Sequence, residues 1–137
     1  MSHEVFTEAW AQAWHQELTA SDAYREAASE WEGSILLEWK GAGEGPHPGI
    51  FADLWHGECR EARVATDEDR ANADFIIRTG LDGWKQILAG KVDPIFGLMT
   101  GKIELARGSV PQLMPFMNAS KELVAAAARI DSIFPED

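Results

Sequence analysis

The apolar residues of this chain are spaced as in helices at both ends and as in strands in between, and this change of spacing restricts the folds that it can adopt. Between residues 5 and 18 an aromatic or aliphatic residue recurs every four positions, which predicts an amphipathic helix. These residues are Phe6, Trp10, Trp14 and Leu18. Ser21 is placed to cap a second helix, which Gly33 should end. From residue 34 apolar and polar residues alternate, as in a strand with one buried face.

The alternating pattern defines most of the strands before helical spacing returns. Strands are expected at residues 34–40, 50–56, 59–65, 73–79 and, after two short helices, 102–107. The Gly- and Pro-rich residues 41–49 predict a connection, and the polar residues 66–72 predict a surface loop. A last helix follows, which Pro115 should interrupt. Short turns make the early strands antiparallel, so we expect one α+β domain over residues 1–137, with helices packed against a mixed or antiparallel sheet.

The charge of the chain disfavours a nucleic-acid partner. The net charge is −11, and residues 1–70 carry −10 of it against −1 for residues 71–137. A nucleic-acid-binding protein needs a basic surface, which this chain lacks. The single Cys59 allows no internal disulfide, and the first residues do not have the pattern of a signal peptide. No run of 18 apolar residues suggests a membrane span. We therefore expect a soluble, cytoplasmic protein.

The sequence offers no motif that predicts catalysis. Residues 41–45 superficially match a dinucleotide-binding fingerprint, but no helix is expected to follow them. The four His residues match no zinc-binding spacing, and Cys59 lacks a recognisable base to activate it as a nucleophile. We therefore expect no enzyme activity, no cofactor and no metal site.

The second half of the chain combines many apolar residues with short helices. Three of the four Met residues fall between residues 99 and 117, and the predicted helices end at Gly90 and Gly101. Met adapts readily to irregular apolar surfaces, and short interrupted helices pack less completely than long ones. These features are compatible with an ordinary core and with a ligand cavity.

Several short segments occur in a characteristic order and spacing. They are Ala73-Asp74-Phe75-Ile76-Ile77, residues 81–91 (LDGWKQILAGK), Asp93-Pro94 and residues 98–103 (LMTGKI), preceded by residues 24–28, 31–33 and 54–59. Together they resemble the sterol-carrier-protein-2 (SCP-2) family of lipid-binding domains, in particular its small stand-alone prokaryotic members. The resemblance spans nearly the whole chain, and the order of the segments makes it specific.

The resemblance implies a five-stranded, mostly antiparallel sheet covered by helices that enclose an apolar tunnel for sterols, fatty acids or fatty acyl chains. Eight residues are expected to line this tunnel: Phe75, Ile77, Trp84, Leu88, Phe96, Met99, Leu113 and Met117. The chain departs from the eukaryotic branch at residues 104–111, which lack its basic, Gly-Asp-containing pattern. It also ends without a Ser-Lys-Leu peroxisomal signal.

The resemblance favours a non-catalytic intracellular module that binds or transfers apolar lipids, with a transient membrane or enzyme contact left open. One alternative is an accessory domain that presents an apolar substrate to a partner enzyme through the acidic N-terminal half. Another is a small cone-shaped α+β enzyme of the ketosteroid-isomerase type. That fold needs long late strands, whereas this chain is expected to end in a helix.

Overall fold

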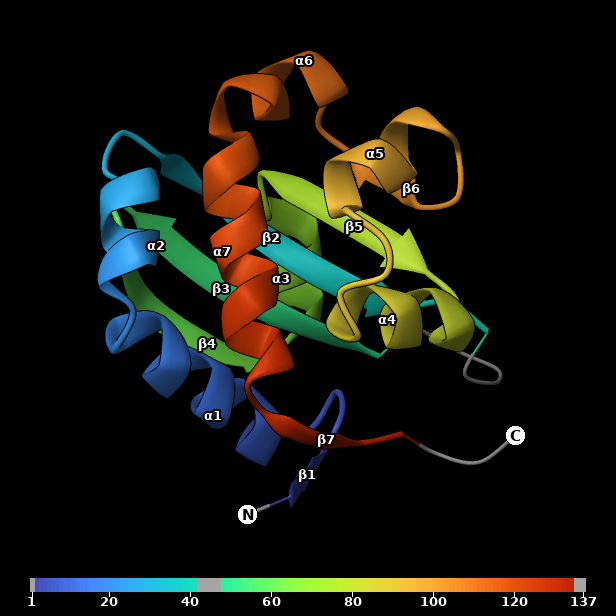
Figure 1. Ribbon diagram of the computed structural model, residues 1–137. Helices are drawn as coiled ribbons and strands as arrows, with labels where there is room; N and C mark the ends of the chain where they lie inside the picture. Colours follow the sequence, from blue (N-terminus) through green and yellow to red (C-terminus); the bar gives the residue numbers. More distant parts are fainter. Residues whose placement is uncertain (1, 42–47, 135–137) are drawn as a thin grey trace.

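The computed structural model describes residues 2–41 and 48–134, which form a five-stranded sheet with most of the helices on one face (Figure 1). The elements in chain order are β1 (Ser2–Glu4), α1 (Glu8–Thr19), α2 (Asp22–Ala27), β2 (Glu32–Trp39), β3 (Gly49–Trp55), β4 (Glu58–Val64), α3 (Asp67–Asn72), β5 (Phe75–Thr79), α4 (Leu81–Leu88), α5 (Pro94–Met99), β6 (Glu104–Arg107), α6 (Val110–Leu113), the 3-10 helix η1 (Met114–Phe116), α7 (Met117–Ala128) and β7 (Asp131–Ile133).

The strand order of the main sheet is β4-β3-β2-β5-β6. The pairing of β2 with β5 is parallel, and the other three pairings are antiparallel. The prediction of an α+β fold with a five-stranded, mostly antiparallel sheet is therefore confirmed. Most of the predicted connection at residues 41–49 lies outside the described residues.

The inner face of the sheet is the one that packs against the helices. Its register places Ile35 opposite Ala52, and Ala52 opposite Ala62, and all three side chains are buried. Helices α1, α4 and α7 cross this face (Figure 1). Alternation along each strand thus directs one set of apolar side chains toward the helices.

The N-terminal segment differs from the prediction of one helix over residues 5–18. Residues Ser2–Glu4 form β1, which pairs in parallel with β7, and Val5 N donates a hydrogen bond to the carbonyl of Ile133 at 3.1 Å. The helix begins only at Glu8, because the side chain of Thr7 caps it by accepting from Trp10 N at 3.3 Å. The two ends of the described chain therefore lie side by side (Figure 1).

Residues 66–72, predicted as a loop, instead form the helix α3. The Thr66 side chain accepts from Asp69 N, and the Asp69 carboxylate accepts from Thr66 N, which is a complete capping box. The helix is polar along its sequence, so it lacks the apolar periodicity by which a helix is recognised. Arg70 of α3 lies 3.4 Å from the buried carboxylate of Glu38, which Arg78 approaches to 2.7 Å.

The helices of the second half are short, as the sequence predicts. Asp93 caps α5 by accepting from the backbone N–H groups of Ile95 and Phe96, and Pro94 occupies its first turn. The last predicted helix is divided into α6, η1 and α7, with Pro115 inside η1. No helix within residues 2–41 and 48–134 has the length and apolar character needed to cross a bilayer.

Candidate functional site

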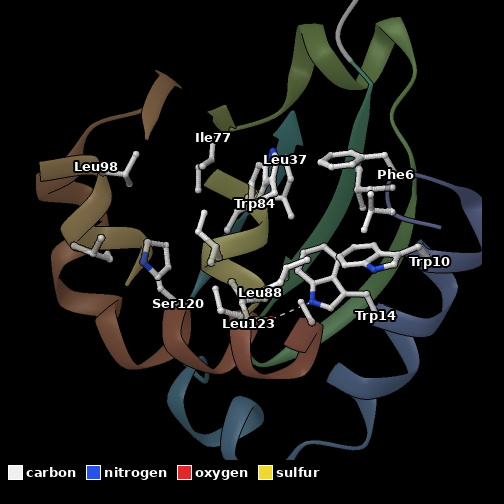
Figure 2. Close-up of a pocket in the computed structure, with 18 of the residues that line it drawn as sticks. Phe6, Trp10, Trp14, Leu37, Ile77, Trp84, Leu88, Leu98, Ser120 and Leu123 are labelled. Atoms are coloured by element: carbon white, nitrogen blue, oxygen red, sulfur yellow. Dashed lines mark hydrogen bonds between the residues drawn. The ribbon is translucent and has the colours of Figure 1, made fainter. Parts of the chain in front are cut away.

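An apolar pocket lies between the inner face of the sheet and the helices that cover it (Figure 2). Its walls come from the N-terminal segment and α1, from strands β2, β3 and β5, and from helices α4, α5, α6 and α7. The lining residues are Val5, Phe6, Trp10, Trp14, Ile35, Leu37, Ile50, Ile77, Trp84, Ile87, Leu88, Pro94, Ile95, Leu98, Leu113, Ser120, Leu123, Val124 and Ala127. None of them carries an ionisable side chain.

The polar atoms of the three lining Trp residues are bonded within the protein. The Nε1 atom of Trp10 donates to Ser132 Oγ at 2.9 Å. That of Trp14 donates to the carbonyl of Leu123 at 3.1 Å, and that of Trp84 to the carbonyl of Glu38 at 2.9 Å. Since each indole N–H already has an acceptor, these rings offer the pocket mainly carbon surface. Among the lining residues that the structure describes, Ser120 alone has a side-chain hydroxyl.

The pocket has a volume of about 70 Å³. Binding sites for small organic molecules usually measure about 300–1,000 Å³, so a long acyl chain or a sterol requires lining side chains to move. One lining residue, Phe6, has a backbone φ of +60° although it is not glycine. Its ring lies 5.7 Å from that of Trp39 and 5.8 Å from that of Trp84, measured between centroids.

Four of the eight residues predicted to line a tunnel do line this pocket, namely Ile77, Trp84, Leu88 and Leu113. They come from β5, α4 and α6, which the fold brings together over the inner face of the sheet.

The structure places the other four predicted residues elsewhere. Phe75 is buried at 5.3 Å from the ring of Trp31, and Met117 is partly buried against the main core. Phe96 and Met99 are 57% and 61% exposed. They lie on the outer side of α5, because Ile95 and Leu98 occupy the side of that helix that faces the pocket.

The sequence prediction missed the contribution of the N-terminal half to the pocket. The four-residue spacing of Phe6, Trp10 and Trp14 predicts a buried helix face, but it does not show whether that face adjoins a core or a pocket. Ile95 and Leu98 were also missed. They lie three residues apart on one side of α5, and the exposed pair Phe96 and Met99 has the same spacing.

A second depression, with a volume of about 750 Å³, is open and more polar. Two of its four carboxylates are engaged, because Asp53 accepts from Arg60 at 2.9 Å and Asp74 accepts from Ser34 N at 2.9 Å. Such a surface is well suited to water, whereas the pocket under the helices is suited to an apolar molecule.

The groups with strongly raised pKa values do not belong to the pocket lining. Burial is the main cause that raises the pKa of the Cys59 thiol to about 12, and the nearby Asp53 carboxylate adds to the effect. Burial likewise raises the pKa of Tyr24. Both groups are therefore neutral near pH 7 and behave as parts of the core.

Comparison with known structures identifies close relatives of the whole fold. A crystal structure of sterol carrier protein 2 is 43% identical, with a TM-score of 0.84, and the match covers 93% of this chain and 99% of that one. A solution structure of a conserved hypothetical protein from Thermus thermophilus, described as possibly a sterol carrier protein, is 42% identical with a TM-score of 0.84. That match covers 97% of this chain and 94% of the other.

A more distant relative shows that the fold persists at low identity. Sterol carrier protein 2 from Yarrowia lipolytica, in its apo form, is 16% identical with a TM-score of 0.58, over 86% of this chain and 88% of that one. A search of curated proteins gave no match. The family model of the SCP-2 sterol transfer family matches residues 13–121. The chain therefore belongs to the SCP-2 sterol transfer family.

Proposed function

We propose that this protein binds a single apolar lipid, a fatty acid, fatty acyl chain or sterol, in the pocket beneath α4, α5 and α7, and transfers it without chemical change. The observation that carries the proposal is the lining itself. Among the described residues it has no ionisable side chain, and its three indole N–H groups are bonded to the protein. Membership of the SCP-2 family supports the same class of ligand.

The energy of burying a lipid is sufficient for this role. Burying about 400 Å² of apolar surface at about 25 cal/mol/Å² yields on the order of 10 kcal/mol. Association and ordering cost several kcal/mol, and moving side chains out of the small pocket costs more. Micromolar affinity remains within reach. Because such binding depends on area, selectivity among lipids of similar shape is expected to be broad.

A second candidate function is the presentation of an apolar substrate to a partner enzyme. The strongly acidic residues 1–70 would supply a docking surface for a basic partner. The structure of a ubiquinone synthesis protein shares the fold, with 15% identity and a TM-score of 0.52. Both functions require an apolar ligand in the pocket. A stable complex with one enzyme would distinguish substrate presentation from lipid transfer.

Displacement of a fluorescent fatty acid tests pocket binding with a matched pair of variants on one helix. Leu98 lines the pocket, whereas the neighbouring Met99 is 61% exposed. Leu98→Asp should lower the affinity for the probe at least tenfold, since it places a charge against an apolar ligand. Met99→Asp should leave the affinity unchanged. Circular dichroism confirms that both variants fold. Equal affinities in the two folded variants would contradict a binding site in this pocket.

A further inference from the structure

Helix α5 is apolar on both of its sides. Ile95, which is 1% exposed, and Leu98 line the pocket, while Phe96 and Met99 are exposed to solvent. A short surface helix normally presents polar residues to water, so a helix with two apolar sides indicates that its outer side is covered at some stage. Helix α6 packs against α5, and Met114, in the η1 helix that follows α6, is 42% exposed. We call Phe96, Met99 and Met114 the α5–η1 surface.

The chain around this surface has a charge opposite to that of the rest of the protein. Residues 85–121 contain five Lys or Arg and two Asp or Glu, a net charge of +3, so the remaining residues carry −14. Lys91 and Lys102 flank α5 in sequence and are exposed. Within residues 2–41 and 48–134, neither has a carboxylate oxygen within the 4.0 Å of an ion pair. Their charge is therefore available to an external partner.

We infer that the α5–η1 surface docks on an anionic lipid membrane, which delivers lipid to the pocket or receives it. Exposed aromatic and Met side chains beside Lys residues suit the interface of a bilayer with negatively charged headgroups. The acidic remainder of the protein does not prevent this contact, because charges are screened beyond about 8 Å at physiological ionic strength. A basic segment in an otherwise acidic chain also orients α5 toward the membrane.

Docking on this side places the bilayer next to one wall of the pocket. Ile95 and Leu98 face the pocket from the same six-residue helix whose other side carries Phe96 and Met99. When Phe96 and Met99 enter the interface, α5 can shift outward without exposing either of its sides to water. Such a shift would enlarge the pocket of about 70 Å³ at the point where lipid arrives. The link between docking and enlargement of the pocket rests on the proposed function, whereas docking on the membrane does not.

Vesicle sedimentation with the full chain tests the docking surface. The unaltered protein should bind phosphatidylglycerol vesicles and bind phosphatidylcholine vesicles much less. The double variant Phe96→Glu/Met99→Glu should bind phosphatidylglycerol at least tenfold more weakly. The matched control is Ile133→Glu, because Ile133 is 46% exposed on β7, which follows the C-terminal end of α7, whereas α6 and η1 precede its N-terminal end (Figure 1). Its replacement should have no effect.

A charge variant separates electrostatic attraction from apolar contact. Lys91→Gln/Lys102→Gln should weaken binding to phosphatidylglycerol vesicles about 30-fold, since each Lys near an anionic surface contributes about fivefold. All of these variants should bind a fluorescent fatty acid in solution as the unaltered protein does. Vesicle binding without any fatty acid binding would contradict the proposed function but support the docking surface.

Three results would overturn the inference. The first is failure of the unaltered protein to bind phosphatidylglycerol vesicles, and the second is equal binding by the Phe96→Glu/Met99→Glu variant. The third is a concentration-dependent dimer that this double variant dissociates, in the absence of vesicle binding, because a second copy would then be what covers the surface. Analytical ultracentrifugation of both proteins without vesicles measures this directly.

Discussion

Replacement of Phe6 should reveal both the strain at this position and the role of its ring in closing the pocket. Phe6 links β1 to α1 with a φ of +60°, and its half-buried ring lines the pocket. Removal of a fully buried Phe side chain costs about 3–5 kcal/mol. We therefore expect Phe6→Ala, at this half-buried site, to lower the free energy of unfolding by about 2 kcal/mol.

Phe6→Gly should be less harmful than Phe6→Ala, which reverses the usual order of these two substitutions. A left-handed backbone costs a residue other than glycine about 1–2 kcal/mol. Glycine avoids this cost, but its greater freedom in the unfolded chain lowers the free energy of unfolding by about 0.5–1 kcal/mol. Phe6→Gly should therefore be about 0.5–1 kcal/mol more stable than Phe6→Ala in urea unfolding at equal m-values.

Both Phe6 variants should also bind a long-chain fluorescent fatty acid more tightly than the unaltered protein. If the ligand must displace the Phe6 ring, binding to the unaltered protein costs the packing energy of that ring, about 2 kcal/mol. A variant without the ring avoids this cost, which corresponds to a gain in affinity of as much as about 30-fold. Titration of the probe measures this gain. The reasoning is refuted if Phe6→Gly is the less stable of the two variants, or if neither variant binds the probe more tightly.

Three further predictions concern single residues away from the pocket. Hydrogen bonds from Arg63 are the main cause that lowers the pKa of Asp69. The ionised carboxylate therefore stabilises the fold fully above its unfolded pKa of about 4, and this stabilisation is lost as the pH falls through the lower pKa of the folded state. Asp69→Asn should flatten the acid limb of the profile of unfolding free energy against pH, and an unchanged limb would contradict this assignment. Cys59, whose pKa is raised to about 12, should react with iodoacetamide at pH 8 only after denaturant is added, as mass spectrometry can show. Gly108→Ala should lower the free energy of unfolding by more than about 2 kcal/mol, because a Cβ atom at φ +97° would lie 2.3 Å from the Phe75 ring; equal denaturation midpoints would refute that clash.

The sequence was most informative where local chemistry acts alone. Ser21 and Asp93 cap helices as predicted, because a short polar side chain before a helix satisfies free N–H groups regardless of the rest of the fold. The strands were recognised because a sheet with one buried face imposes alternation. By contrast, β1 and β7 pair across almost the entire chain, and three-residue strands carry too little periodicity to be detected.

The candidate site could be predicted only in part, for a reason visible in α5. Ile95, Phe96, Leu98 and Met99 are all apolar, so hydrophobicity cannot show which two face the pocket. Contacts with α6 and α7 determine the orientation of α5, and those contacts lie outside the local sequence of the helix. The aromatic stripe of α1 was recognised as a buried face, but a buried face looks the same in sequence whether it adjoins a core or a pocket.

A native mass spectrum of the gently purified full chain tests most directly whether the pocket holds a lipid. The account predicts a species heavier than the bare chain by the mass of one lipid, or the appearance of such a species after incubation with a fatty acid. Leu98→Asp should lose this species and Met99→Asp should retain it. Only the bare chain, even after incubation with fatty acids and sterols, would contradict the account.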